Sequence, residues 1–188
     1  MITDFLTVNP YSRPGTKLNK VKAIIIHWTA NPKLDEKGNR NYFESLKSGK
    51  TKTYGSSHYI IGQSGNVLQC IPEKEIAYHC GSSCNDPVSQ RPYTDFARKK
   101  FGLDMKPSPN FCTIGIELCP LDMNGKFDNK TISSAVDLCV DICKRYNLTE
   151  QDILTHNMIV GWKDCPRWWV THPYLIEEFR LMVKEKLE

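Results

Sequence analysis

The sequence predicts an α/β fold: a single domain whose central mixed β-sheet is flanked by helices. Residues 21–28 form a nearly continuous apolar run, which is typical of a strand covered on both faces. Two strand-like segments, 54–61 and 67–71, flank a run of turn residues and therefore indicate a hairpin. Further along the chain, residues 131–146 repeat apolar positions with the period of a helix. Strands interleaved with helices, with one hairpin among them, favour a mixed sheet.

The first part of the chain is expected to contain an irregular arm, a strand and a short helix. Residues 1–20 contain Pro10, Pro14 and Gly15 and are expected to be neither helix nor strand. The strand at 21–28 follows. Gly38 and Gly49 then bracket a short predicted helix that carries Tyr42, Phe43 and Leu46.

The second part of the chain is expected to add a long connection, a strand and two helices. Residues 79–111 are rich in Pro, Ser, Cys and Asn and are expected to be irregular, with one helix near 93–101. Residues 111–118 form an apolar strand interrupted by one carboxylate. The helix at 131–146 has Thr131 as its expected N-cap and Asn147 just after its end. The last helix, 172–186, places apolar residues on one face: Leu175, Phe179, Met182 and Val183.

Composition describes an ordinary globular protein with a mildly basic charge of +4. A well-solvated surface explains that charge, although attraction to an anionic polymer such as a cell wall is the alternative. No arginine-rich run or aromatic stacking module supports nucleic-acid binding. No apolar run is long enough for membrane insertion, and the first residues lack a signal-peptide pattern. We therefore expect synthesis in the cytoplasm, and no obligate protein partner is inferred.

Most of the eight cysteines are expected to be packing residues. Cys139 and Cys143 share the apolar face of the predicted helix, and Cys112 and Cys119 flank the predicted strand at 111–118. Cys80 and Cys84 lack the CxxC spacing of a metal or redox pair, and whether they form a disulfide is left open.

His27, His156 and Cys165 form a candidate zinc site. His27 follows the buried run at 21–26, at a strand end where α/β sheets place their ligands. Two imidazoles and one thiolate supply three protein ligands and leave the fourth tetrahedral position open, which indicates a catalytic zinc site rather than a structural one. The alternatives are a structural role for His27, a surface position for His156 and a buried, unligated thiol for Cys165. A structural zinc site would need a fourth ligand, for which Asp164, His172 and Cys119 are the candidates.

Glu117 and Lys163 are candidate catalytic residues. Glu117 interrupts an otherwise apolar strand, where an unpaired carboxylate is costly if buried. It either faces water from an edge strand or points into the cleft as a general base. Lys163 lies two residues before Cys165, so its ammonium group is expected near the metal, where it could stabilise an oxyanion. The alternative for Lys163 is a solvated surface lysine.

With these residues, the chain resembles the zinc-dependent N-acetylmuramoyl-L-alanine amidases of type 2. This family includes phage and prophage endolysins and is related to the peptidoglycan recognition proteins. The resemblance covers roughly residues 9–180. It rests on five segments in family order: Ile24-Ile-Ile-His27-Trp-Thr-Ala, Ser56-Ser-His-Tyr-Ile-Ile61, Ile76-Ala-Tyr-His-Cys-Gly81, Thr113-Ile-Gly-Ile-Glu117-Leu, and Thr155-His156 with Lys163-Asp-Cys165-Pro. Residues 21–188 then correspond to the catalytic domain and residues 1–20 to its N-terminal arm.

The resemblance implies zinc-dependent hydrolysis of the amide between N-acetylmuramic acid and L-alanine in peptidoglycan. His27, His156 and Cys165 match the zinc ligands, and Glu117 and Lys163 match the catalytic pair. One zinc per chain is expected. Cys165 stands where many members have aspartate, and Tyr78 stands where tryptophan is usual, so substrate preference does not transfer at Tyr78.

Several further expectations concern the cleft and the biological setting. His79 is expected near the substrate, while Trp28, Tyr54 and Trp162 are expected to line a sugar or stem-peptide groove. His58 is expected to have a packing or supporting role, and Trp168 and Trp169 to anchor the last helix. The alternatives to an enzyme that acts on the wall after release are a non-catalytic peptidoglycan-binding module and a cytoplasmic amidase that recycles wall fragments.

Overall fold

A computed structural model describes residues 1–81, 93–102 and 108–188. In these ranges six strands form one mixed sheet in the order β1-β4-β3-β5-β2-β6. Only the β3–β4 pair is antiparallel, and it is the predicted hairpin. The strands are β1 (Ile2–Thr3), β2 (Ala23–Trp28), β3 (Tyr59–Ile61), β4 (Val67–Gln69), β5 (Thr113–Leu118) and β6 (Ile153–Thr155). The predicted α/β class and mixed sheet are confirmed.

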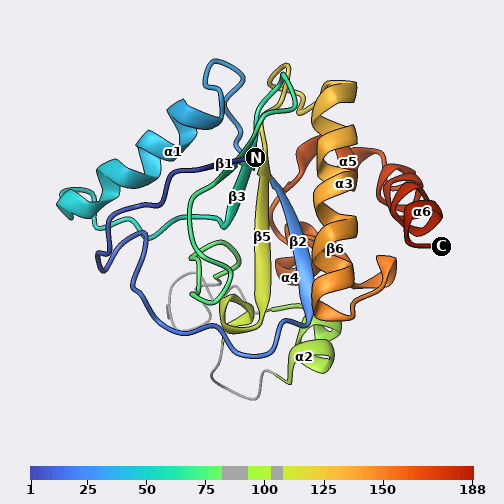
Figure 1. The fold of residues 1–188 in the computed structure, drawn as a ribbon, viewed down its shortest axis with the longest axis horizontal. Coiled ribbons are helices and arrows are strands. Elements are labelled where there is room, and N and C mark those ends of the chain that lie inside the picture. The colour runs from blue at the N-terminus through green and yellow to red at the C-terminus, as the bar shows by residue number, and fades with distance from the viewer. Residues whose placement is uncertain (82–92, 103–107) are drawn as a thin grey trace.

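Helices cover both faces of this sheet (Figure 1). The α-helices are α1 (Glu36–Ser45), α2 (Asp95–Phe101), α3 (Asn129–Tyr146), α4 (His156–Val160), α5 (Arg167–Thr171) and α6 (Tyr174–Leu187). Three short 3-10 helices are η1 (Leu46–Ser48), η2 (Pro109–Phe111) and η3 (Glu150–Asp152). Among the described residues no helix has both the length and the apolar character needed to cross a membrane.

The alternation of side chains along β2 and β5 divides the interior into two faces. Even-numbered residues of both strands, such as Ile26 and Ile116, pack with α3 and α6 in the larger core. Odd-numbered residues point to the opposite face, where Ile25 packs in a second cluster that includes Ile159 of α4. His27 and Glu117 are odd-numbered members of this second face. The pleat of two central strands therefore decides where functional side chains can emerge.

The start of α3 differs from the position predicted from the sequence, because a local hydrogen bond fixes it three residues earlier. Asp128, not Thr131, is the N-cap of α3, because its carboxylate accepts from the Lys130 backbone N–H. The Thr131 hydroxyl is buried within the first turn and donates to the Gly62 carbonyl at 2.9 Å, which ties α3 to the β3–β4 turn. Asn147 ends the helix in a left-handed conformation, as predicted.

The N-terminal arm is more ordered than expected. Ile2–Thr3 form a parallel pair with β4, so part of residues 1–20 is strand. Leu6 is buried in a cluster with Ile60 and Leu68. β1 has only two residues, which is too short for a periodic apolar pattern to predict it from the sequence. The arm therefore packs against the hairpin edge of the sheet.

The remaining aromatic and cysteine expectations have mixed outcomes. Trp169 is buried against Phe179 of α6, as expected, and the partly buried Trp168 packs against the same core while its ring stacks on His172 with ring centroids 3.8 Å apart. Met182 is 38% exposed and does not belong to the buried face of α6. The cysteines described, including Cys139 and Cys143, are buried and unpaired. Cys84, for which a disulfide with Cys80 was left open, lies outside the described residues.

Candidate active site

The three predicted metal ligands come together from three parts of the chain. His27 lies near the end of β2, a central strand between β5 and β6. His156 begins α4 directly after β6, and Thr155 caps this helix by accepting from the Met158 backbone N–H. The parallel β2–β6 pairing places the end of β6 beside the end of β2. A sheet register therefore brings together two histidines that are distant in sequence.

Cys165 is held against His156 by the loop that follows α4. The Asn157 backbone N–H donates to the Cys165 carbonyl at 2.9 Å. The Asn157 side-chain amide also donates to the Lys163 carbonyl at 3.0 Å. Asn157 thus fixes the loop that carries both the thiol and the candidate catalytic lysine.

The separations between the candidate donor atoms suit a tetrahedral zinc site. The Nδ1 atoms of His27 and His156 lie 3.1 Å apart, and the Cys165 Sγ lies 3.7 Å from the His27 Nδ1. Zinc bonds of about 2.0–2.1 Å to nitrogen and about 2.3 Å to sulfur place tetrahedral ligands roughly 3.3 Å (N to N) and 3.6 Å (N to S) apart. All three side chains are buried and their donor atoms converge within 4.8 Å. Their chemistry and spacing therefore fit a zinc ion.

Burial sets the protonation of these donors. It lowers the pKa of His27 well below its usual value, and the neighbouring His156 and His79 lower it further. Burial also lowers the pKa of His156 to about 3, with a smaller contribution from Lys163. Burial raises the pKa of Cys165 and the charge of Glu117 raises it further, whereas the Trp28 backbone N–H and Lys163 lower it. Neutral imidazoles are the form that binds zinc, so burial suits both histidines to this role.

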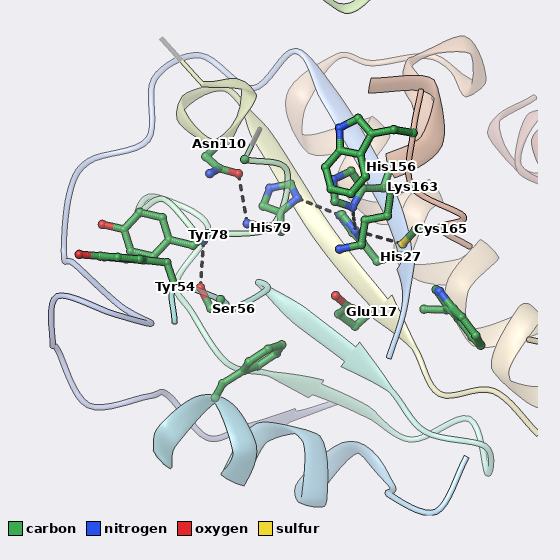
Figure 2. A pocket seen from close by; sticks show the side chains of 15 residues that line it. His27, Tyr54, Ser56, Tyr78, His79, Asn110, Glu117, His156, Lys163 and Cys165 are labelled. Carbon is green, nitrogen blue, oxygen red and sulfur yellow. Dashed lines mark hydrogen bonds between the residues drawn. The ribbon is translucent and has the colours of Figure 1, made fainter. Parts of the chain in front are cut away.

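Glu117 faces this site from the neighbouring strand. In the β2–β5 pair it is the direct register partner of His27, so the two side chains emerge on the same face (Figure 2). Because β5 lies between β3 and β2, the alternative of an edge strand is wrong. The Glu117 Oε2 is shielded from water and has no hydrogen-bond partner among the described residues. Burial raises the pKa of Glu117 to about 8, and Lys163 opposes that rise.

A pocket of about 610 Å³ joins the predicted residues. The members predicted from the sequence are His27, Trp28, Tyr54, His79, Glu117, His156, Trp162, Lys163 and Cys165. Figure 2 shows the Lys163 side chain beside the histidine pair. Tyr54 is 60% exposed at the rim, and its ring lies 5.3 Å from that of Tyr11 and 5.5 Å from that of Tyr78.

Some lining residues were not predicted as site residues: Phe43, Gly55, Ser56, Tyr78, Gly81 and Asn110. Asn110 accepts two backbone hydrogen bonds, from His79 at 3.1 Å and from Cys80 at 2.8 Å, and so holds the segment that carries His79. No sequence pattern marks Asn110, because its role depends on a contact across 31 residues.

The candidates for a fourth protein ligand do not join the cluster. Over the ranges that the structure describes, the convergent group contains His27, His156 and Cys165 alone. Asp164 is exposed, and the ring of His172 stacks on Trp168. Cys119 accepts from the Asn39 amide at 3.4 Å. A closed structural zinc site therefore has no support in this part of the chain.

Comparison with known proteins gives consistent results. A family model described as N-acetylmuramoyl-L-alanine amidase matches residues 17–168. A probable N-acetylmuramoyl-L-alanine amidase of Bacillus licheniformis is 34% identical over 100% of this chain and 48% of its own length. The N-acetylmuramoyl-L-alanine amidase BlyA of Bacillus subtilis is 31% identical over 97% of this chain and 46% of its own length. The chain thus spans about half the length of these relatives.

Solved structures share the fold. The structure of PlyL superposes with a TM-score of 0.70 at 20% identity, and covers 98% of this chain and 96% of that one. The catalytic domain of XlyA superposes with a TM-score of 0.68 at 21% identity, and covers 97% of both chains. At 20–21% identity these superpositions show that the fold is shared, and they show nothing beyond the fold.

Proposed function

Since the chain belongs to the N-acetylmuramoyl-L-alanine amidase family, we propose that it hydrolyses the amide between N-acetylmuramic acid and L-alanine in peptidoglycan, with zinc bound by His27, His156 and Cys165. The observation that carries this proposal is the convergence of three zinc-type ligands beside a shielded carboxylate in one pocket. Bound zinc would supply a Lewis acid that polarises the amide carbonyl and lowers the pKa of water.

Glu117 acts as the general base and then the general acid in this proposal. It takes a proton from the attacking water as the new C–O bond forms at the carbonyl carbon. It then returns that proton to the amine nitrogen as the C–N bond breaks, so the products are a carboxylic acid and a free L-alanine amino group. A pKa raised to about 8 by burial makes Glu117 able both to accept and to release a proton near neutral pH.

Lys163 stabilises the negative charge that develops on the carbonyl oxygen. It lines the same pocket, and its charge contributes to the pKa shifts of Glu117, His27 and Cys165. A fixed ammonium group aimed at a developing oxyanion lowers the activation barrier without reorganisation of water. Lys163 is therefore assigned as the electrostatic partner of Glu117.

The substrate lies along the aromatic rim of the pocket. Trp28, Tyr54 and Trp162 line the pocket, and their rings suit the apolar faces of sugars or stem-peptide side chains. His79 lines the deeper wall. In a digestion assay, Tyr54→Ala tests this assignment through an increase in KM with little change in kcat; an unaltered KM would remove Tyr54 from the substrate site.

The setting proposed is the cell wall, reached after release from the cell that makes the protein. Digestion of purified peptidoglycan sacculi tests the function. New L-alanine amino termini without new reducing ends are expected. New reducing ends would indicate a glycosidase, and retention on sacculi without products would indicate a binding module. Cleavage of soluble wall fragments but not of sacculi would favour a recycling amidase.

A further inference from the structure

His79 is held rigidly on the face of the sheet that carries the site. Its ring lies against Gly115 of β5, where a Cβ atom would lie only 2.6 Å from the His79 Cγ. Asn110 fixes the backbone of the same segment. Both ring nitrogens contact other side chains: Nδ1 lies 3.0 Å from the His27 Nε2, and Nε2 lies 3.1 Å from the Thr113 Oγ1. The ring therefore has little freedom to turn toward a substrate.

The direction of the hydrogen bonds follows from one backbone carbonyl. The Thr113 hydroxyl lies 2.8 Å from the Pro109 carbonyl oxygen, and that oxygen can only accept. The single hydroxyl proton is therefore on this bond. The Thr113 oxygen must then accept from the other neighbour, so the His79 Nε2 carries a proton and donates.

The position of the ring proton on His27 follows from the contact between His27 and His79. The His79 ring is buried and forms no ion pair with a carboxylate of the described residues, so it is neutral; with its proton on Nε2, its Nδ1 is an acceptor. The Cys80 thiol, 3.4 Å away, is a weak second donor to that Nδ1. The stronger donor is the His27 Nε2–H. With its one ring proton on Nε2, His27 keeps a lone pair on Nδ1, which is the nitrogen that faces His156 and Cys165.

We propose that His79 is a positioning residue for the metal site: the chain Pro109–Thr113–His79 fixes His27 in the tautomer whose Nδ1 can bind zinc. This inference rests on the zinc site of the proposed function. Hydrogen bonds from a ligand's second ring nitrogen fix its tautomer and orientation, and their loss typically lowers metal affinity about 10- to 100-fold.

Of the two candidate histidine ligands, only His27 has a hydrogen-bond partner at its Nε2 among the described residues. The His156 Nε2 is buried and has no hydrogen-bond partner among the residues described. Along β5, the odd-numbered positions provide a hydroxyl at Thr113, space for the ring at Gly115 and the carboxylate of Glu117. One strand face thus serves both the positioning of a ligand and the proposed general base.

The tautomer can be observed directly by two-bond ¹H–¹⁵N correlation NMR of metal-free protein labelled at histidine. The wild type is expected to show the His27 ring proton on Nε2. His58 serves as an internal reference, since its Nε2 contacts the Glu75 carbonyl at 2.9 Å and its Nδ1 accepts from the Gly115 N–H at 3.0 Å. A wild-type His27 with its proton on Nδ1 would overturn the proposal.

Zinc affinity, measured by competition with a chelator, provides the second readout. Thr113→Val removes the hydroxyl at nearly constant volume and should weaken zinc binding about 10- to 100-fold. Thr113→Ser retains the hydroxyl and should bind zinc about as tightly as the wild type. Equal zinc affinity in the two variants would overturn the proposal. If Thr113→Val does not fold, the proposal is tested by the NMR measurement of the His27 tautomer in the wild type. Failure of the proposed function can be told apart from failure of this inference. A wild type that binds zinc but releases no L-alanine termini would refute the amidase activity, while the His27 tautomer and the zinc affinities could still be measured.

Discussion

His27 and Glu117 are direct register partners in the parallel pair of β2 and β5. A candidate zinc ligand and a candidate general base are therefore placed side by side by backbone hydrogen bonds rather than by loops. A register shift of one residue would turn either side chain to the opposite face, into the core with α3 and α6. The central position of both strands makes this placement rigid, which catalysis by a fixed base requires.

Glu117→Gln should separate function from stability. Loss of the base is expected to lower kcat by about 10²- to 10⁴-fold while zinc content remains that of the wild type. In the metal-free protein burial raises the pKa of Glu117 to about 8, so its ionisation destabilises that form as pH rises from about 4.5 to 8. Glutamine removes that penalty, so the metal-free variant at pH 8 should unfold at or above the temperature of the metal-free wild type. A variant that turns over like the wild type would exclude Glu117 as the base.

Lys163→Met should change the pH profile as well as the rate. The Lys163 charge lowers the pKa of Glu117, so its loss should raise that pKa and move the acidic limb of kcat/KM to higher pH. The rate at the optimum should fall about 10²- to 10³-fold, as for loss of one oxyanion donor. Lys163→Arg retains the charge and should keep the limb in place. An unshifted limb in Lys163→Met would show that the lysine does not act on Glu117.

Cys165→Ala should abolish tight zinc binding. The wild type is expected to contain about one zinc per chain, and loss of a ligand removes a bond that the two histidines cannot replace. Cys139→Ala is the matched control, because Cys139 is also fully buried but lies in the core on α3. Metal analysis after dialysis compares the two. Equal zinc content in both variants would mean that Cys165 is not a ligand.

Much of this arrangement was visible in the sequence. The strand at 21–28 and the strand at 111–118 were predicted within two residues, because most of their positions are apolar over a strand-length segment. The three candidate zinc ligands and the candidate catalytic pair, Glu117 and Lys163, were predicted from the sequence, and the structure brings all five side chains into one pocket.

The rest depended on contacts that no local pattern encodes. β6 has three residues, too few to show a period, yet its pairing with β2 positions His156. The hydrogen bonds of Asn110 and Thr113 to the His79 segment join parts of the chain more than 30 residues apart. The role of Gly115 becomes clear only when the ring that it accommodates is known.

Gly115→Ala should destabilise the protein through His79. The added methyl group would lie 2.6 Å from the His79 Cγ, so the ring or the strand must move, which typically costs about 1–3 kcal/mol. Gly81→Ala is the control, since no atom of the described residues lies within 4 Å of the methyl group that it would add. Its free energy of unfolding should change by less than about 0.5 kcal/mol. Denaturant unfolding checks both, and equal effects would show that the contact between His79 and Gly115 is not tight.

His58 predicts how the stability of the metal-free protein depends on pH. Burial lowers the pKa of His58 to about 4, although the Glu75 carbonyl and the charges of Glu73 and Glu75 oppose the shift. In the folded protein the ring is neutral, with its Nδ1 accepting from the Gly115 N–H, and protonation would break that bond. In the unfolded chain the ring takes up a proton near pH 6.5. The unfolded state then binds more protons, so the contribution of His58 to stability is full above about pH 6.5 and is lost as the pH decreases toward 4.

Two measurements check this expectation together. The free energy of unfolding should decrease between pH 7 and pH 5 when it is measured with denaturant on the metal-free Glu117→Gln variant, in which Glu117 no longer contributes an opposite trend. Over the same interval the NMR signals of the His58 ring should remain those of a neutral imidazole, because the folded state resists protonation until its pKa near 4 is approached. A His58 ring that titrates near pH 6.5 in the folded protein would contradict the prediction, as would a stability that is flat from pH 7 to 5. Because the His58 ring also lies against the ring of His79, with ring centroids 5.9 Å apart, protonation of His58 should displace the His79 side chain that contacts His27.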